Sequence, residues 1–142
     1  MTDKISVSGA ASAAAIPASP TAIGSLAMVN LDSPDPGAHA DFYSGVLGWP
    51  VVHRSAEYAM LSTEGAAPIG FGLVEKYQAP GWPDDSSTKR FHFDIYVDDI
   101  AEAEKRCHAL GATTPEFQPG GDRWRVVLDP AGQPLCLCAR PS

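Results

Sequence analysis

The chain has 142 residues, of which 44% are hydrophobic, and a formal net charge of −7. This length suits one domain with its own core, and the acidic balance excludes nucleic acid as a partner, because phosphate binding needs clustered lysine and arginine. No stretch is long and apolar enough to cross a membrane, so no membrane partner is expected.

The first residues differ in composition from the rest of the chain. Residues 1–21 are rich in alanine, serine and proline, and they lack the charged start and the solid apolar core of a signal peptide. We predict a flexible N-terminal extension over 1–21 and a single domain over 22–141.

The first half of this domain carries signals for one helix and four strands. Residues 23–31 are predicted to form a strand, after which Asp35 can serve as a helix N-cap and Pro36 as the first helical residue. The predicted helix spans 37–47 and ends at Gly48. Three short strands are then predicted at 50–53, 58–62 and 69–75.

A long loop is predicted between the two halves. Residues 77–90 contain Pro80, Gly81 and Pro83, and loops of this length tend to be functional. Trp82 is a large apolar side chain within this polar segment, so we expect it to pack over another part of the domain.

The second half repeats the order of the first. Residues 91–97 alternate between apolar and polar side chains, which places His92, Asp94 and Tyr96 on one face of a strand. Asp99 can cap the helix that follows. This helix would cover the apolar face of the strand and leave the polar face to line a cavity. A closing hairpin is predicted from strands at 123–128 and 135–139.

The repeated strand–helix–strands unit predicts two similar modules around one shared concavity. Module one would span 22–76 and module two 91–141, joined by the 77–90 linker. His39 and His108 lie on the two predicted helices, and we expect both on the solvated surface.

The three cysteines do not indicate disulfides. Their number is odd, and Cys136 and Cys138 lie on one face of a predicted strand, too far apart for easy bridging. We interpret both as small buried hydrophobic side chains, because no basic neighbour that would activate a thiol is evident. A reducing cytoplasm is the expected location.

Four motifs give the chain a family resemblance. They are Asp41-Phe42-Tyr43, Val46-Leu47-Gly48-Trp49, His92 through Asp99, and Asp129-Pro130-Ala131-Gly132. In the order and spacing of these motifs, residues 23–140 resemble the vicinal oxygen chelate superfamily. This superfamily includes glyoxalase I, fosfomycin-resistance enzymes, bleomycin-binding proteins and extradiol dioxygenases. The resemblance implies an α+β fold of two βαβββ modules whose curled mixed sheets surround a shared cavity. It also implies a small-molecule ligand and a homodimer.

The resemblance further locates the positions at which metal-dependent members hold a divalent ion. Carried over, these are Ser25 on the first strand, His92 on the first strand of module two and Cys136 on the last strand, with a further position near Gly72. Only His92 keeps the family's ligand type, and Lewis-acid chemistry needs about three protein ligands. We therefore predict no cofactor and no complete metal site. A divalent metal, if bound, would use His92 and Cys136, whose thiolate suits a soft ion.

His92 is the main candidate for chemistry. It could act as a general base oriented by Asp94, and the alternative is a hydrogen-bonded structural residue. We expect Arg123 or Arg125 to pair with the Asp94 carboxylate. Tyr77, Trp82 and Trp124 could form an aromatic wall for a planar ligand. The full set of predicted ligand contacts is His92, Asp94, Tyr96, Trp124, Trp82, Tyr77 and Cys136.

Three functions remain open. The first is a small-molecule-binding protein without a complete metal site, of the antibiotic-binding type. The second is a metal-dependent lyase, isomerase or dioxygenase with a non-standard ligand set. The third is metal-free acid–base catalysis by His92 and Asp94.

Overall fold

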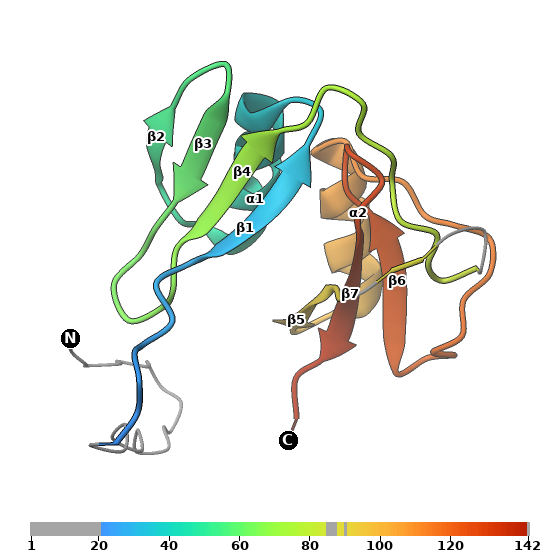
Figure 1. Cartoon of the computed structure of the whole chain (residues 1–142). Helices are drawn as coiled ribbons and strands as arrows, with labels where there is room; N and C mark the ends of the chain where they lie inside the picture. Colours follow the sequence, from blue (N-terminus) through green and yellow to red (C-terminus); the bar gives the residue numbers. More distant parts are fainter. Residues whose placement is uncertain (1–20, 85–87, 90, 142) are drawn as a thin grey trace.

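The computed structural model describes residues 21–84, 88–89 and 91–141, which form two β-sheets and two helices (Figure 1). The first module contains β1 (Val29–Ser33), α1 (Pro36–Leu47), β2 (Val51–Arg54), β3 (Tyr58–Leu61) and β4 (Ile69–Leu73). The second contains β5 (Phe93–Val97), α2 (Ile100–Ala109), β6 (Trp124–Leu128) and β7 (Pro134–Ala139). The predicted α+β class is confirmed. The predicted N-terminal extension, apart from its last residue, lies outside the described residues.

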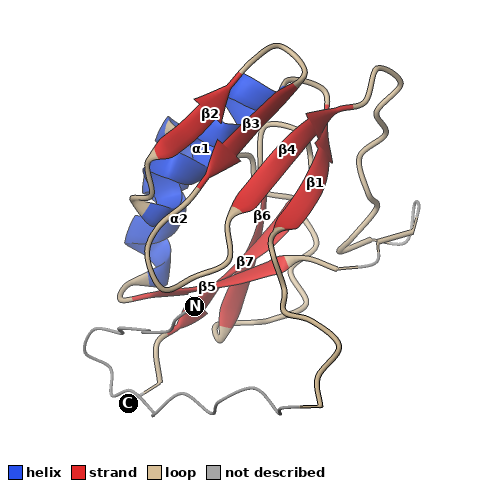
Figure 2. Cartoon of the chain, turned by 60° about the vertical axis from the view of Figure 1, so that its left-hand side comes forward, coloured by secondary structure: helices blue, strands red, loops and turns tan. Residues whose placement is uncertain are grey.

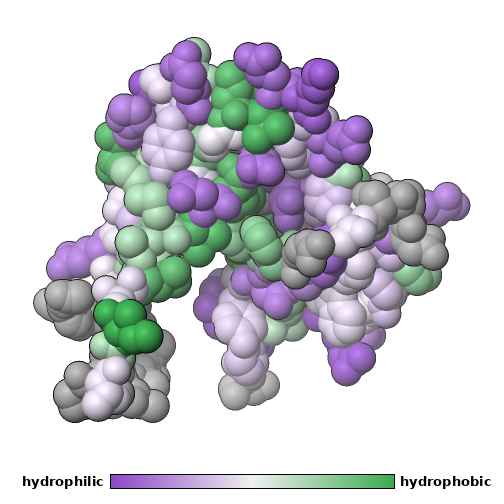
Figure 3. Space-filling model, in the orientation of Figure 1, coloured by the Kyte–Doolittle hydropathy of each residue, from purple (hydrophilic) through white to green (hydrophobic). Residues whose placement is uncertain are grey.

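Each module builds one sheet. The strand orders are β1-β4-β3-β2 and β5-β7-β6, and in each sheet the module's first strand runs parallel to its last. Figure 1 shows α1 and α2 behind the two sheets, and Figure 2 shows both helices on the same side of them. We call the opposite, helix-free faces the front faces. On this side Figure 3 shows a hollow between the two halves.

Both helices begin at the predicted N-caps. The Asp35 carboxylate accepts from the N–H of Ala38 at 3.2 Å, and the Asp99 carboxylate accepts from the N–H of Glu102 at 3.0 Å. Gly48 ends α1 with a φ of 75°, the left-handed region that favours glycine. These local signals therefore set the start of both helices and the end of α1 as predicted.

The first strand is shorter than predicted. β1 begins at Val29, whose N–H donates to the carbonyl of Pro68 at 3.0 Å, and its ladder with β4 starts at the Val29–Ile69 pair. Pro68 has no N–H, so the partner strand cannot continue the ladder backwards. Residues 23–28 lie outside the sheet, the side chains of Ile23 and Leu26 among them are exposed, and the predicted start of this strand was wrong.

The second module has one regular strand fewer than the first. The strand that the βαβββ plan places directly after α2 is reduced to an isolated bridge between Thr113 and Leu128. Further along, the side-chain amide of Gln118 takes the place of a strand. Its Oε1 accepts from the N–H of Val126, and its Nε2 donates to the carbonyl of the same residue, both at 2.9 Å. With the bridge counted, this module is consistent with the βαβββ plan.

The core joins the two modules. Tyr43 of α1 packs against Phe71 of β4 and Phe93 of β5, with ring centroids 5.8 and 5.5 Å apart. His39, one turn earlier on the same helix, is only 2% exposed, so its predicted place on the solvated surface was wrong. Burial is possible because the ring bonds to the buried Asp129 of the second module.

Candidate functional site

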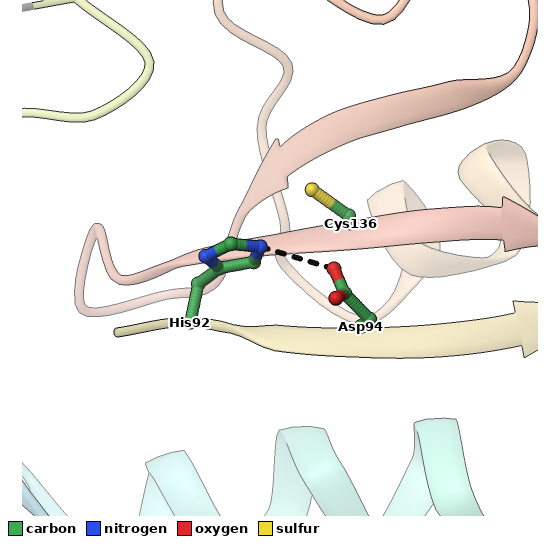
Figure 4. A group of neighbouring side chains, drawn as sticks. All are labelled: His92, Asp94 and Cys136. Atoms are coloured by element: carbon green, nitrogen blue, oxygen red, sulfur yellow. Dashed lines mark hydrogen bonds and ion pairs between the residues drawn. The ribbon is translucent and has the colours of Figure 1, made fainter. Parts of the chain in front are cut away.

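The front face of the second sheet carries a compact group of polar side chains. His92 directly precedes β5, and Asp94 lies on β5 opposite Cys136 of β7. Each of the three side chains offers one atom that could bind a metal ion, and these three atoms lie within 4.8 Å of one another (Figure 4). Phe93 and Ile95 pack against the core instead, as the predicted alternation requires. We call His92, Asp94 and Cys136 the front-face cluster.

Hydrogen bonds fix the orientation and the proton of the His92 ring. Lys89 Nζ lies 3.0 Å from His92 Nδ1, and Asp94 Oδ1 lies 3.0 Å from His92 Nε2. Because an ammonium group can only donate, Nδ1 accepts, and Nε2 carries the proton that is donated to the carboxylate. The neutral imidazole with its hydrogen on Nε2 is the tautomer that fits both contacts.

Trp82 of the linker covers this ring. Its indole stacks on His92 with centroids 4.8 Å apart and an interplanar angle of 16°, and Lys89 Nζ lies 4.3 Å from the indole centroid. The prediction that Trp82 packs over another part of the domain is therefore confirmed. The side chain of His92 is 23% exposed and that of Asp94 65%, so the cluster is covered at one end and open to solvent at the other.

The Cys136 thiol is the buried member of the cluster. Burial, and then the neighbouring Asp94 carboxylate, raise the pKa of Cys136 to about 12. A thiol that stays protonated at neutral pH is a weak nucleophile. The interpretation of this residue as a small buried side chain fits its 2% exposure and its free thiol.

The prediction that Arg123 or Arg125 pairs with the Asp94 carboxylate was wrong. Arg125 pairs in the ladder with Leu137, which faces the core, so its side chain emerges on the helix side of the sheet. There Arg125 Nε lies 3.1 Å from Glu104 Oε1 of α2. Arg123 lies over an indole ring instead. The Asp94 carboxylate instead accepts from the His92 imidazole at 3.0 Å.

Lys89 is the member of the site that sequence reasoning missed. It lies in the linker three residues before His92, where no strand or helix period fixes the direction of a side chain. A basic residue close before a candidate histidine is the only signal that the sequence offers. Its contact with Trp82 depends on how the linker folds back over the sheet.

The remaining predicted ligand contacts lie in two places. Tyr96 and Trp124 are on the front face, one row along from the cluster, because the ladders pair both with Cys138. Tyr77 lies in a cleft of about 440 Å³ that is lined by residues of both modules. The Tyr77 hydroxyl is buried and has no hydrogen-bond partner among the described residues. The structure brings Trp82 to the cluster but leaves Tyr77 in this separate cleft.

The matching position in the first module is not the one that the resemblance implied. Counted back from the helix N-caps, Asp35 and Asp99, the residue that matches His92 is Met28. Ser25 lies outside the sheet, so its assignment as the equivalent position was wrong. A methionine thioether is a weak hydrogen-bond acceptor and cannot replace the imidazole as a base.

Tyr58 lies on that face of the first sheet, beside Met28 and Asn30. In the ladders, Asn30 of β1 corresponds to Asp94 of β5, and Gly70 of β4 corresponds to Cys136 of β7. The Tyr58 hydroxyl donates to Asn30 Oδ1 at 3.0 Å and lies 3.4 Å from the Met28 sulfur. Among the described residues, the donor cluster is therefore a feature of the second sheet alone.

The front-face cluster offers the donor types of a divalent metal site. Imidazole nitrogen, carboxylate oxygen and thiolate sulfur all bind zinc, and catalytic zinc has three protein ligands and an open position. The donor set fits, but the hydrogen bonds place a proton on His92 Nε2, and the raised pKa of Cys136 keeps a proton on its thiol, so both oppose metal binding. A metal ion would displace both. With these protons in place, the cluster can hold a ligand by hydrogen bonds and stacking.

Comparisons with known proteins agree with this architecture. A family model described as a glyoxalase-like domain matches residues 28–138. The chain is similar to a glyoxalase/bleomycin resistance protein/dioxygenase family enzyme from Burkholderia phytofirmans, with 24% identity, coverage of 82% of this chain and 98% of that one, and a TM-score of 0.61. A glyoxalase-related enzyme from Fulvimarina pelagi gives 21% identity, coverage of 84% and 90%, and a TM-score of 0.59.

A resistance protein is also among the similar structures. The bleomycin resistance determinant encoded on the transposon Tn5 has 25% identity, coverage of 84% of this chain and 100% of that one, and a TM-score of 0.52. A comparison with curated proteins found no match. Within the described residues, neither helix has the length and apolar character that crossing a membrane requires.

Proposed function

Because this chain belongs to the family of glyoxalase-like domains, we propose that it binds a small organic molecule on the front face of its second sheet. The observation that carries this proposal is the His92 ring, stacked on Trp82 and hydrogen-bonded to Lys89 and Asp94. An aromatic platform beside fixed polar groups is typical of ligand sites. The proposed contacts are His92, Asp94, Tyr96, Trp82, Trp124 and Cys136, and Tyr77 is proposed as a contact in its own, separate cleft.

The proposed ligand is a planar or aromatic compound of the antibiotic type. Two tryptophans on or over this face offer stacking surfaces, and the exposed Asp94 carboxylate offers an acceptor for a ligand N–H. The similarity to a bleomycin resistance determinant supports a role in which binding sequesters the drug. Such a role needs no complete metal site.

Titration with bleomycin, followed by tryptophan fluorescence and calorimetry, tests this function. We expect saturable binding that Trp82→Ala weakens by about tenfold or more, as is typical for a central aromatic contact. His92→Ala should also weaken binding, whereas His53→Ala, on an exposed strand of the first sheet, should not. Equal affinity in the wild type and Trp82→Ala would contradict the proposed place, and the absence of saturable binding would contradict the proposed ligand.

A metal-dependent lyase, isomerase or dioxygenase is the second candidate function. The observation that favours it is the approach of three potential metal donors to within 4.8 Å of one another. A bound divalent ion would supply Lewis-acid activation of a substrate oxygen. Turnover of the hemithioacetal of methylglyoxal and glutathione that depends on added divalent metal would support this candidate. Turnover that is indifferent to chelators but lost in His92→Ala would instead support acid–base catalysis by His92 and Asp94.

We propose that the protein acts as a homodimer in the cytoplasm. The family resemblance supports the homodimer. The free cysteines support a reducing compartment such as the cytoplasm. Light scattering on the purified full chain tests the first part. Fractionation of the producing cells tests the second.

A further inference from the structure

Two contacts hold the Lys89 ammonium group over the front-face cluster. It donates to His92 Nδ1 at 3.0 Å, and it lies 4.3 Å from the centroid of the Trp82 indole. A cation at this distance from an indole is attracted by the negative face of the ring. Since Trp82 also stacks on His92, the three side chains fix one another.

This arrangement leaves no free lone pair for a metal on His92 Nε2, the ring nitrogen that faces Asp94. Nδ1 of His92 is occupied as an acceptor by Lys89, so the ring hydrogen lies on Nε2 and points at Asp94 Oδ1. A histidine binds a metal only through a nitrogen that has no hydrogen. The nitrogen nearest to Asp94 is thus a donor of a hydrogen bond and not a ligand.

In other respects the cluster is close to the dimensions of a zinc site. Bonds of about 2.0–2.3 Å in a tetrahedral site place neighbouring ligand atoms roughly 3.3–3.8 Å apart. His92 Nε2 and Asp94 Oδ1 are 3.0 Å apart, and all three donor atoms lie within 4.8 Å of one another. Small side-chain rotations would therefore bring the three donors to bonding distances.

We propose that Lys89 is a positioning residue that keeps His92 in the tautomer unable to bind a metal, and that the front-face cluster is a latent three-ligand zinc site. When the ammonium group leaves, the ring hydrogen can move from Nε2 to Nδ1, which frees the Nε2 lone pair toward the carboxylate and the thiol. On zinc binding, Cys136 loses its proton to solvent and becomes the thiolate ligand. The proposal uses the site of the proposed function but does not depend on its ligand.

Metal titration of the full chain tests the proposal without any enzymatic assay. Zinc affinity is measured by competition with a chromophoric chelator, and cobalt(II) is added separately to detect the thiolate-to-cobalt absorption band. We expect Lys89→Met to bind zinc at least about tenfold more tightly than the wild type. Lys105→Met, which removes an exposed lysine from α2, is the matched control and should behave as the wild type. Adding Cys136→Ser to Lys89→Met should abolish the cobalt band.

The histidine tautomer gives a second and independent measurement. Nitrogen-15 NMR of the wild-type imidazoles should show the hydrogen of His92 on Nε2, and Trp82→Ala, which removes the platform of the ammonium, should shift the ring toward the other tautomer. Unchanged or weaker zinc binding in Lys89→Met would overturn the proposal, as would a wild-type ring with its hydrogen on Nδ1. Neither result depends on whether bleomycin binds, so the two proposals fail separately.

Discussion

His39 Nε2 lies 2.6 Å from Asp129 Oδ2, and this contact joins α1 of the first module to the turn between β6 and β7 of the second. The same oxygen accepts from the Tyr43 hydroxyl at 2.8 Å, and Oδ1 accepts from the N–H groups of Ala131 and Gln133 at 2.8 and 3.0 Å. The buried carboxylate thus has four donors. It holds the two modules together by polar contacts inside the core.

Removing His39 should therefore destabilise the whole domain. His39→Ala leaves a buried carboxylate without one of its donors and opens a cavity, so we expect the free energy of unfolding to fall by about 3–5 kcal/mol. Urea denaturation followed by circular dichroism measures this. Asp41→Asn disrupts the exposed pair with Arg54 and should lower the free energy of unfolding far less, because solvent screens exposed charges. A loss of that smaller size in His39→Ala would show that the contact does not hold the modules together.

Local features of the fold could be predicted from the sequence. Asp35 and Asp99 were identified as N-caps and Gly48 as a helix end, because each acts on backbone groups within a few residues. The alternation of β5 was equally readable, since a strand repeats every two residues. The family resemblance placed these pieces in the correct order.

Features that depend on distant partners could not be predicted. The burial of His39 follows from a partner 90 residues away in the chain, and no helical period indicates that partner. The start of β1 depends on where its partner strand begins, at Ile69. The place of Lys89 depends on the path of the linker over the second sheet. Each of these is set by tertiary contacts and not by local preference.

Raised pKa values predict a loss of stability at alkaline pH. Burial, and then the charges of Asp129 and Asp32, raise the pKa of Tyr77 from 10.0 to about 12, and the pKa of Cys136 is raised from 9.0 to about 12. A group whose pKa is higher in the folded state favours folding below its unfolded pKa, and this contribution is lost as the pH rises through the folded value. We therefore expect the free energy of unfolding to decline between about pH 9 and pH 12.

The Tyr77 part of this decline can be isolated. Tyr77→Phe removes one of the ionising groups without adding volume, so its unfolding free energy should fall less steeply with pH than that of the wild type. Urea titrations at several alkaline pH values give the two slopes. Identical slopes would show that the Tyr77 phenol titrates as it does in the unfolded chain.

Cys136 should react slowly with alkylating reagents while the protein is folded. The thiolate is the reactive form, and burial together with Asp94 holds its population low. Asp94→Asn removes a negative neighbour, lowers the pKa of Cys136 and should raise its rate of modification several-fold, since each pKa unit changes the thiolate fraction about tenfold. Mass spectrometry after iodoacetamide treatment measures the rate at each cysteine, with Cys107 as the internal control. A rate at Cys136 unchanged by Asp94→Asn would contradict this account.

A last prediction concerns the first sheet, where Tyr58 stands in the place of the donor cluster. A Cβ on Gly70 would collide with the Tyr58 hydroxyl and with Asn30 Oδ1, whereas a Cβ on Gly72, two residues along the same strand, would meet nothing within 4 Å. We expect Gly70→Ala to lower the free energy of unfolding by about 1–3 kcal/mol through overpacking. Gly72→Ala is the matched control and should be tolerated.

A double variant shows whether the Tyr58 hydroxyl is the cause of this overpacking. Tyr58→Phe removes the hydroxyl but not the ring, so it should recover part of the stability lost in Gly70→Ala. Urea denaturation of the two single variants and the double variant gives the coupling between the sites. If the two losses in unfolding free energy simply add, the Tyr58 hydroxyl is not the cause of the overpacking in Gly70→Ala.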